Sequence, residues 1–160
     1  HLIRHAKSSW KEPSLADMDR PLNKRGRRSC RIMAPELVKA GCSFDPVFSS
    51  PALRARLTIE TIAQNLFAQA IQWETANRLY TFDSHDLVQW FREQDESLSR
   101  VTVIGHNPAM TGFINHLAGA RLDNLPTCGY ARLNCGPLAW KDLYAGCAKM
   151  TAFLKPKMFA

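Results

Sequence analysis

The sequence contains no long apolar run. No window of the 160 residues approaches the roughly 18 consecutive apolar residues that a membrane-spanning helix needs, and the chain does not open with the basic and apolar segments of a secretory signal. The five cysteines are odd in number, and none of them are paired at CxxC spacing, which argues against a disulfide framework or a zinc site. We therefore expect a cytoplasmic protein that binds no membrane and holds no metal ion or other cofactor.

Repeats, low-complexity tracts and linkers are also absent, so the length predicts a single domain over residues 1–160. The formal net charge of +7 indicates anionic partners. The basic residues are dispersed, apart from the cluster Lys24-Arg25-Gly26-Arg27-Arg28, and no zinc-finger or aromatic RNA-binding pattern accompanies them. A phosphate-bearing substrate accounts for part of this charge as well as nucleic acid does. We predict a monomer without a nucleic-acid partner.

Short apolar runs alternate with helical patterns along the chain. Strands are predicted at Leu2–Ile3, Asp45–Ser49, Val101–Ile104, Tyr130–Asn134 and Lys149–Leu154, with a shorter one at Ile71–Glu74. Helices are predicted from Asn23 to Gly41, from Ser50-Pro51 onward with Leu53, Leu57, Thr61 and Ile62 facing inward, from Asp83 or Ser84 to about Gln94, and from Asn107-Pro108 to Gly119. Pro35 should kink or break the first helix. The alternation predicts a three-layer α/β/α fold with a mostly parallel central sheet.

Three of the predicted strands end in residues suited to phosphate chemistry. Arg4-His5 follows the first strand, Ser50 to Arg56 follows the second, and Gly105-His106-Asn107-Pro108 follows the strand at Val101–Ile104. The carboxyl ends of parallel strands share one rim, where ligands bind. Helices that start after Ser50 and after His106 add free N–H groups to that rim. This pattern predicts an anion-binding pocket that contains a nucleophile.

Each of these residues has a chemical interpretation and a simpler structural one. A neutral nitrogen of His5 can attack phosphorus if a backbone carbonyl or similar acceptor holds the proton on the other nitrogen; otherwise His5 is structural. His106 either donates to a phosphoryl oxygen or is a packed loop residue. Arg54 and Arg56 lie about 200° apart on a helix, so only one of them can offer its planar fork to the pocket. The simpler interpretation is that either arginine is a solvent-facing helix residue.

Arg20 precedes the first predicted helix in an extended segment. It either reaches over the phosphate as a third arginine or pairs with Asp17 or Asp19.

Three segments resemble motifs of the histidine phosphatase superfamily, which has the phosphoglycerate mutase-like fold. Leu2-Ile3-Arg4-His5-Ala6-Lys7-Ser8 resembles the Arg-His-Gly signature, the segment from Ser50 to Thr58 resembles Ser-Pro-x-x-Arg-Ala-x-x-Thr, and Gly105-His106-Asn107-Pro108 resembles the second histidine motif. The Ser-Pro motif selects Arg54 over Arg56. The short chain, the stretch from Asp19 to Gly26 and the carboxyl-terminal segment are most similar to SixA-type phosphohistidine phosphatases.

The resemblance implies a phosphoglycerate mutase-like fold without a large cap domain. It also implies a metal-free reaction through a phosphohistidine on His5. The catalytic residues that it implies are His5, His106, Arg4 and Arg54, and the substrate-binding residues are Arg4, Arg20, Arg54, Ser8, His106 and Asn107.

The chain departs from the superfamily pattern in ways that bear on the substrate. Ala6 replaces the usual glycine, Lys11 stands where mutases have asparagine, and the segment Leu79–Asp86 has no glutamate where larger relatives carry a general acid. Mutase activity is therefore not expected. A histidine leaving group, with an imidazolium pKa of about 6.5, is far less basic than an alkoxide and depends less on an acid. Asp19 and Asp86 are the candidate acids if the reaction uses one.

These observations predict a phosphatase that removes phosphate from phosphohistidine in a protein of the histidine-phosphorelay type. Two alternatives remain open at this point. One is a phosphatase of small phosphomonoesters, and the other is a non-catalytic module that binds phosphate or nucleic acid.

Overall fold

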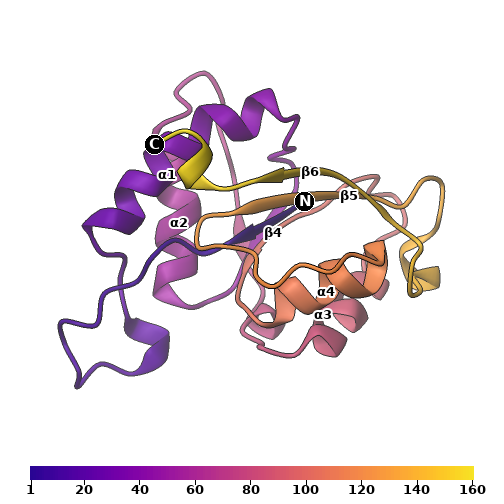
Figure 1. The fold of residues 1–160 in the computed structure, drawn as a ribbon, viewed down its shortest axis with the longest axis horizontal. Coiled ribbons are helices and arrows are strands. Elements are labelled where there is room, and N and C mark those ends of the chain that lie inside the picture. Colours follow the sequence, from indigo (N-terminus) through magenta and orange to yellow (C-terminus); the bar gives the residue numbers. More distant parts are fainter.

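The computed structural model describes all 160 residues and contains six strands and four α-helices (Figure 1). The strands are β1 (Leu2–Arg4), β2 (Val47–Ser49), β3 (Glu74–Thr75), β4 (Thr102–Gly105), β5 (Tyr130–Asn134) and β6 (Lys149–Leu154). The helices are α1 (Lys24–Lys39), α2 (Leu53–Gln64), α3 (Ser84–Arg92) and α4 (Ala109–Ala118), and the short 3-10 turns are η1 (Asp17–Asp19), η2 (Asn77–Leu79), η3 (Trp140–Asp142) and η4 (Pro156–Met158). None of the helices is both long enough and apolar enough to cross a bilayer.

The strands form one mixed sheet in the order β3-β2-β4-β1-β5-β6. The first four of these are parallel, whereas β5 runs antiparallel to β1 and β6 antiparallel to β5. Arg4 pairs with Gly105, and Ser49 pairs with Ile104, so β1, β2 and β4 end at nearly the same level. The residues that follow these three strands therefore enter the same rim of the sheet, as the sequence predicts.

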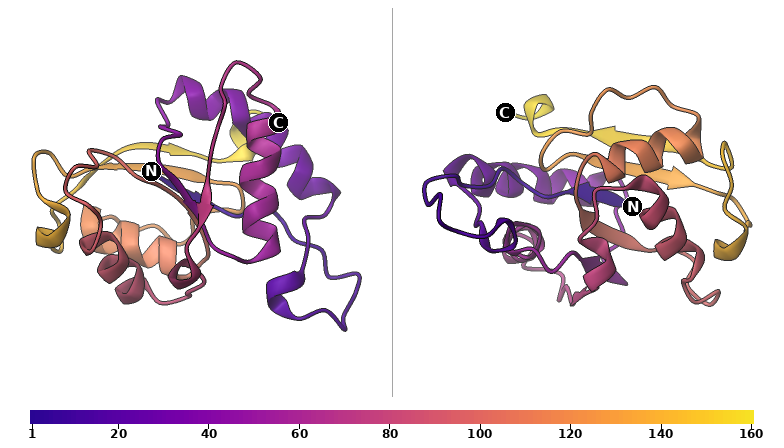
Figure 2. Two further views of the ribbon diagram at one scale, coloured as in Figure 1. Left: turned by 180° about the vertical axis from the view of Figure 1, so that it is seen from behind. Right: turned by 90° about the horizontal axis from the view of Figure 1, so that it is seen from below.

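Two apolar cores lie on opposite faces of the sheet, because successive side chains of a strand alternate in direction. Leu2 and Val103 belong to the core under α3 and α4, whereas their neighbours Ile3 and Ile104 belong to the core under α1 and α2. The ribbon views show these two helix pairs on either side of the sheet (Figure 2). The three-layer α/β/α prediction with a mostly parallel sheet is thus confirmed, and the two covered faces explain why the strands read as continuous apolar runs.

Three details of the sequence prediction are wrong. The break that the sequence allowed at Pro35 does not occur, because α1 continues to Lys39; packing of the neighbouring turns into the core maintains a helix that lacks one backbone donor. The inner face of α2 includes Thr61 and Ile62, as predicted, and the half-buried Leu57 packs against its core, but Leu53 is only half-buried and does not. Fully or nearly fully buried residues of α2 are Arg54, Ala55, Thr58, Ile59, Thr61 and Ile62. Strand β3 comprises Glu74–Thr75 instead of Ile71–Glu74.

The amino end of α1 packs against the chain that leaves β1. Asn23 caps the helix by accepting a hydrogen bond from the Gly26 N–H at 2.8 Å, and its own N–H donates to the Lys7 carbonyl at 3.0 Å. A β-carbon at Gly26 would lie 2.3 Å from that carbonyl oxygen. Only glycine allows this approach. The close contact holds the segment that follows His5 against the start of α1.

We predict that Gly26→Ala destabilises the protein by about 2 kcal/mol, because the new methyl group must push backbone atoms apart. For a chain of this size, the loss corresponds to a Tm lower by roughly 4–8 °C. Arg27→Ala, an exposed change on the same turn, is the control and should leave the Tm nearly unchanged. Thermal unfolding followed by circular dichroism measures both, and equal Tm values for the two variants would contradict the close approach.

Candidate active site

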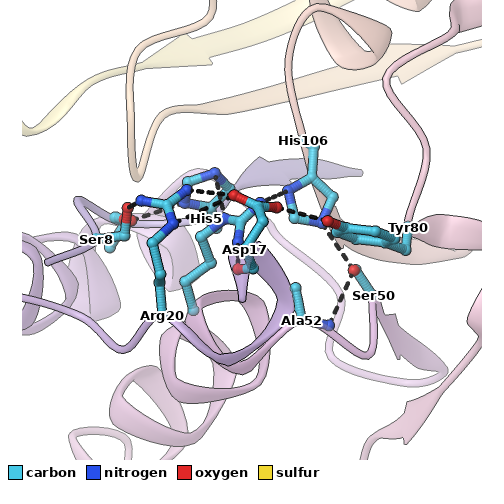
Figure 3. A network of polar contacts seen from close by, with 10 residues as sticks. His5, Ser8, Asp17, Arg20, Ser50, Ala52, Tyr80 and His106 are labelled. Atoms are coloured by element: carbon cyan, nitrogen blue, oxygen red, sulfur yellow. Dashed lines mark hydrogen bonds and ion pairs between the residues drawn. The ribbon is translucent and has the colours of Figure 1, made fainter. Parts of the chain in front are cut away.

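The level ends of β1, β2 and β4 bring His5, Ser50 and His106 together at the rim (Figure 3). The two imidazole rings lie with their centroids 5.1 Å apart, at an angle of 54°. His5 is 9% exposed and His106 is 1% exposed, so both rings are largely removed from water. The sequence predicted that the two histidines meet at this rim, and the structure brings them together.

The orientation of His5 leaves one nitrogen available for attack. Its Nδ1 lies 2.8 Å from the carbonyl oxygen of Ala6, and because a carbonyl can only accept, Nδ1 carries the ring proton. Nε2 therefore bears a lone pair, and Arg54 donates to it through Nε at 3.3 Å. This is the tautomer that a histidine nucleophile requires.

Arg54 joins the two histidines. Besides donating to His5, it lies with Nη2 3.4 Å from Nδ1 of His106, and its side chain is 3% exposed. Arg56, the alternative weighed in the sequence, is exposed and donates to the Pro51 carbonyl at 3.1 Å. The motif therefore selected the arginine that faces the rim.

His106 is held from its far side by Ser50. Its Nε2 lies 2.7 Å from the Ser50 hydroxyl oxygen, which also accepts from the Ala52 N–H at 3.2 Å. Because the guanidinium of Arg54 only donates, Nδ1 of His106 is an acceptor and the ring proton belongs on Nε2. Tyr80 and Phe82 pack against the ring with centroids 5.4 Å away. His106 thus presents Nδ1 towards His5 and Arg54.

Burial sets the charge of both imidazoles. It lowers the pKa of His5 to about 4, an effect that the hydrogen bond to Ala6 opposes and the charge of Arg54 reinforces. Burial lowers the pKa of His106 to about 3, and repulsion from His5 and Arg54 adds to the effect. In the site as it stands, both rings are neutral near pH 7. A protonated His106 that donates to a phosphoryl oxygen from Nδ1 therefore requires a bound anion to offset this environment.

Arg20 and Ser8, both predicted to bind substrate, contact each other through Arg20 Nη1 and the Ser8 hydroxyl at 2.9 Å. Arg20 also pairs with Asp17 at 2.6 Å, which is one of the two partners that the sequence allowed. Its guanidinium carbon lies 3.7 Å from the centre of a Trp10 ring. These contacts hold Arg20 over the rim from the loop between β1 and α1.

Arg4 and Asn107 both contact the loop before β5. Arg4 Nη1 donates to the Leu125 carbonyl at 2.8 Å, and Asn107 Nδ2 donates to the same oxygen at 3.0 Å. Both amino groups also donate to the side chain of Asn124, at 3.1 and 2.7 Å. Nε of Arg4 is the only buried side-chain nitrogen or oxygen without a hydrogen-bond partner. An orphaned cationic donor of this kind suits an anion that completes its contacts.

Four residues contribute to the site in ways that the sequence reading did not assign. Thr58 ties β1 to α2, because its hydroxyl accepts from the Ala6 N–H at 2.9 Å and donates to the Arg54 carbonyl at 2.7 Å. Ser50 and Thr58 both stand in the Ser-Pro motif, so their presence was visible and only their roles were missed. Asp17 and Tyr80 come from two loops and meet through a 2.5 Å hydrogen bond from the tyrosine hydroxyl. No local sequence pattern predicts the contact between Asp17 and Tyr80.

The candidate acids do not contact this group of residues. Asp86 accepts a hydrogen bond from the Thr81 hydroxyl at 2.8 Å, and Asp19 is exposed on η1. The carboxylate that reaches the arginines is Asp17. Partial burial favours its protonated form, but hydrogen bonds from Tyr80, Arg20 and Arg54 outweigh this and lower the pKa of Asp17 well below its ordinary range. It is therefore ionised at neutral pH and cannot act as a proton donor.

The rim therefore combines a neutral imidazole lone pair with several guanidinium groups. These are the nucleophile and the stabilising cations that attack on a phosphoryl group requires. A larger hollow of about 720 Å³ lies at the other end of the strands, beside His1, Val101 and Trp140, and none of the predicted site residues line it. No group of three or more histidine, cysteine, aspartate or glutamate side chains is arranged to hold a metal ion.

Comparison with known proteins gives a consistent result. The family model described as "Histidine phosphatase superfamily (branch 1)" matches residues 1–83. An uncharacterised protein of Mycobacterium tuberculosis is 28% identical over 97% of this chain and 100% of its own length. An uncharacterised chloroplastic protein of Arabidopsis thaliana is 28% identical over 90% of this chain and 69% of its own length.

Solved structures share the whole fold. A SixA protein from Agrobacterium tumefaciens has a TM-score of 0.80 and 27% identity, and covers 97% of this chain and 96% of its own. The protein histidine phosphatase SixA complexed with tungstate has a TM-score of 0.79 and 21% identity, over 99% and 97% of the two chains. The fold is thus phosphoglycerate mutase-like and of the SixA type. With the family model spanning more than half of its residues, the chain belongs to the histidine phosphatase superfamily.

Proposed function

We propose that this protein is a protein-phosphohistidine phosphatase in which His5 is the nucleophile. The observation that carries the proposal is the state of His5: its Nδ1 proton is held by the Ala6 carbonyl, and its Nε2 lone pair lies within reach of Arg54. A neutral imidazole nitrogen beside guanidinium groups can attack phosphorus. The similarity to SixA proteins supports the same substrate class.

The reaction proceeds in two displacements. In the first, His5 Nε2 forms a bond to phosphorus while the bond from phosphorus to the substrate's histidine nitrogen breaks, and that nitrogen takes a proton from water. In the second, water attacks the phosphorylated His5, releases inorganic phosphate and returns the imidazole to its neutral form. Arg54 and Arg4 stabilise the charge on the phosphoryl oxygens in both steps, with Arg20 as a further cation. His106 donates to these oxygens from Nδ1 once the bound phosphoryl group favours its protonated form. We propose that no metal ion takes part.

The protonation states of the site favour a leaving group of low basicity. The one carboxylate that contacts its arginines, Asp17, is ionised and offers no proton. An alkoxide would require a proton donor that is worth about 10²–10⁴-fold in rate. An imidazole that leaves in its neutral form has a conjugate acid with a pKa of about 6.5, so a proton from water suffices and no donor from the protein is needed. This argument favours phosphohistidine over small phosphomonoesters.

The surroundings of the pocket favour a protein as the carrier of the phosphate. Trp10, 69% exposed, stacks on Arg20, and Phe82, 47% exposed, packs against His106. Exposed aromatic side chains around a charged centre are typical of surfaces that bind proteins. Lys24, Arg25 and Arg27 are exposed at the start of α1, beside the segment that follows β1. Their charge suits a carrier with an acidic surface, and we propose no nucleic-acid partner.

We predict that Arg54→Lys lowers kcat/KM by about 10²–10³-fold, because lysine keeps the charge but loses the planar fork that spans two oxygens. Arg56→Lys is the matched control: it lies two residues away on the same helix, is exposed, and should change kcat/KM less than twofold. Steady-state kinetics with a phosphohistidine-carrying protein measures both variants. Equal losses in the two would rule out the assigned role of Arg54.

We predict that the wild-type protein takes up acid-labile label from a phosphohistidine carrier protein, and that His5→Ala takes up none. Turnover by this variant should be lower by about 10³-fold or more, because the covalent route is removed. Rapid quenching followed by electrophoresis detects the labelled enzyme. Full activity in His5→Ala would end the nucleophile assignment, and faster turnover of alkyl phosphates than of the carrier would replace the proposed substrate with small phosphomonoesters.

We predict that His5 is still neutral at pH 6. In the folded protein its pKa is about 4, whereas an unfolded chain binds the proton at about 6.5. Because the unfolded state takes up the proton first, stability should fall as the pH drops from about 6.5 towards 4. NMR titration of the imidazole resonances, with His5→Ala used for assignment, measures the midpoint directly. A midpoint at or above 6.5 would refute the desolvated, neutral nucleophile.

A further inference from the structure

The carboxylate of Asp17 collects hydrogen bonds from three different segments of the chain (Figure 3). Arg54 Nη2 donates to Oδ2 at 2.9 Å, and Arg20 donates to Oδ1 through Nη2 at 2.6 Å and Nε at 3.2 Å. The Tyr80 hydroxyl donates to Oδ2 at 2.5 Å. The Asp17 carbonyl also accepts from Arg54 Nη1 at 2.6 Å. One residue thus occupies donors of both arginines at the mouth of the site.

These donors are the ones that suit a phosphoryl group. Two guanidinium groups arranged around one anion can each offer a pair of N–H groups to its oxygens. Asp17 supplies two oxygens and one negative charge, whereas a phosphoryl group supplies three oxygens and up to two charges. Arg54 also contacts the attacking nitrogen of His5, so its donors cannot serve the incoming phosphate fully while Asp17 retains them.

Asp17 is placed so that it can move away. Its side chain is 43% exposed, and it stands on the short turn η1 within a loop in which no residue from Ser9 to Asp19 is buried. The side chains of its partners Arg20 and Arg54 are only 9% and 3% exposed, so the loss of Asp17 is offset only when another anion takes its place. The arginines, by contrast, are fixed by the core: Arg54 belongs to α2, and Arg20 donates to the buried Ser8. Releasing the carboxylate therefore leaves the cationic side of the site intact.

We propose that Asp17 is a resident anion of the phosphate site, which the phosphoryl group of the substrate displaces from Arg54, Arg20 and Tyr80. The inference rests on the phosphoryl-binding role of the site in the proposed function, but it does not depend on which molecule carries the phosphate. Because it must be displaced, Asp17 weakens the binding of every anion that competes for the two arginines. Free phosphate must displace it unaided, whereas a phosphoryl group on a protein gains further contacts with the rim.

The consequence for specificity is discrimination against the product. Inorganic phosphate carries the same oxygens as the transferred group, and a site with uncompensated arginines would retain it. A carboxylate that returns to the arginines competes with the product and favours its release. Asp17 is therefore a specificity-determining residue of this site, and its removal should tighten the binding of small anions.

The test compares Asp17→Asn with Asp19→Asn by isothermal titration calorimetry with inorganic phosphate. Both changes remove one negative charge from η1, but only Asp17 contacts the arginines, and asparagine preserves its shape. We expect the Kd for phosphate to fall about tenfold in Asp17→Asn and less than twofold in Asp19→Asn. Tyr80→Phe removes one hydrogen bond to the carboxylate and should also tighten phosphate binding, with no additional effect in the double variant with Asp17→Asn.

Weaker binding of phosphate in Asp17→Asn would overturn the inference, because it would mean that Asp17 orients the arginines instead of competing for them. Equal effects of Asp17→Asn and Asp19→Asn would overturn it too, because they would reduce the role of Asp17 to its charge alone. The proposed function is judged separately. If phosphate binds more tightly to Asp17→Asn but the wild-type protein does not turn over a phosphohistidine carrier, the phosphohistidine substrate is rejected and the resident-anion role of Asp17 is retained.

Discussion

Exclusion of water from the two imidazoles is the constraint on which the rest of the site depends. A histidine in water is partly protonated near neutral pH and then has no lone pair to offer. Burial of His5 and His106 suppresses the charged form of each, and the neighbouring Arg54 suppresses it further. The cation that prepares the site for phosphate therefore also keeps the nucleophile neutral. A single guanidinium has both effects because it contacts both rings.

That arrangement depends on the sheet more than on the loops. The pairing of Arg4 with Gly105 and of Ser49 with Ile104 fixes the levels at which β1, β2 and β4 end. Thr58 then joins the first strand to the helix that carries Arg54, through one accepted and one donated hydrogen bond. Regular elements thus position the nucleophile and its main cation, and an exposed loop supplies Asp17, which adjusts the charge of the site. Sites built in this way keep their geometry when a ligand exchanges.

The sequence was informative where a residue's position follows from local rules. Strand ends share a rim in parallel sheets, so His5 and His106 could be brought together from the apolar runs that precede them, and helical spacing reduced Arg54 and Arg56 to a single choice. It was less informative where placement depends on packing. Leu53 was misjudged as part of the inner face of α2, because its apolar side chain suggests burial, whereas the helix buries the neighbouring Arg54 instead. The contact between Asp17 and Tyr80 joins residues 63 positions apart on two irregular loops, and no periodicity encodes it.

The distribution of protons in the site gives the most direct link between structure and substrate. Asp17 is ionised because Tyr80 and the arginines stabilise its charge, and the same hydrogen bond raises the pKa of Tyr80, so that the phenol holds its proton more tightly. In the site without substrate, this contact keeps Asp17 ionised and makes the Tyr80 phenol a weaker acid. A site of this composition can stabilise the negative charge of a phosphoryl group but has little to offer a strongly basic leaving group. An imidazole leaving group needs no proton donor from the protein, because imidazolium, with a pKa of about 6.5, is a far stronger acid than an alcohol.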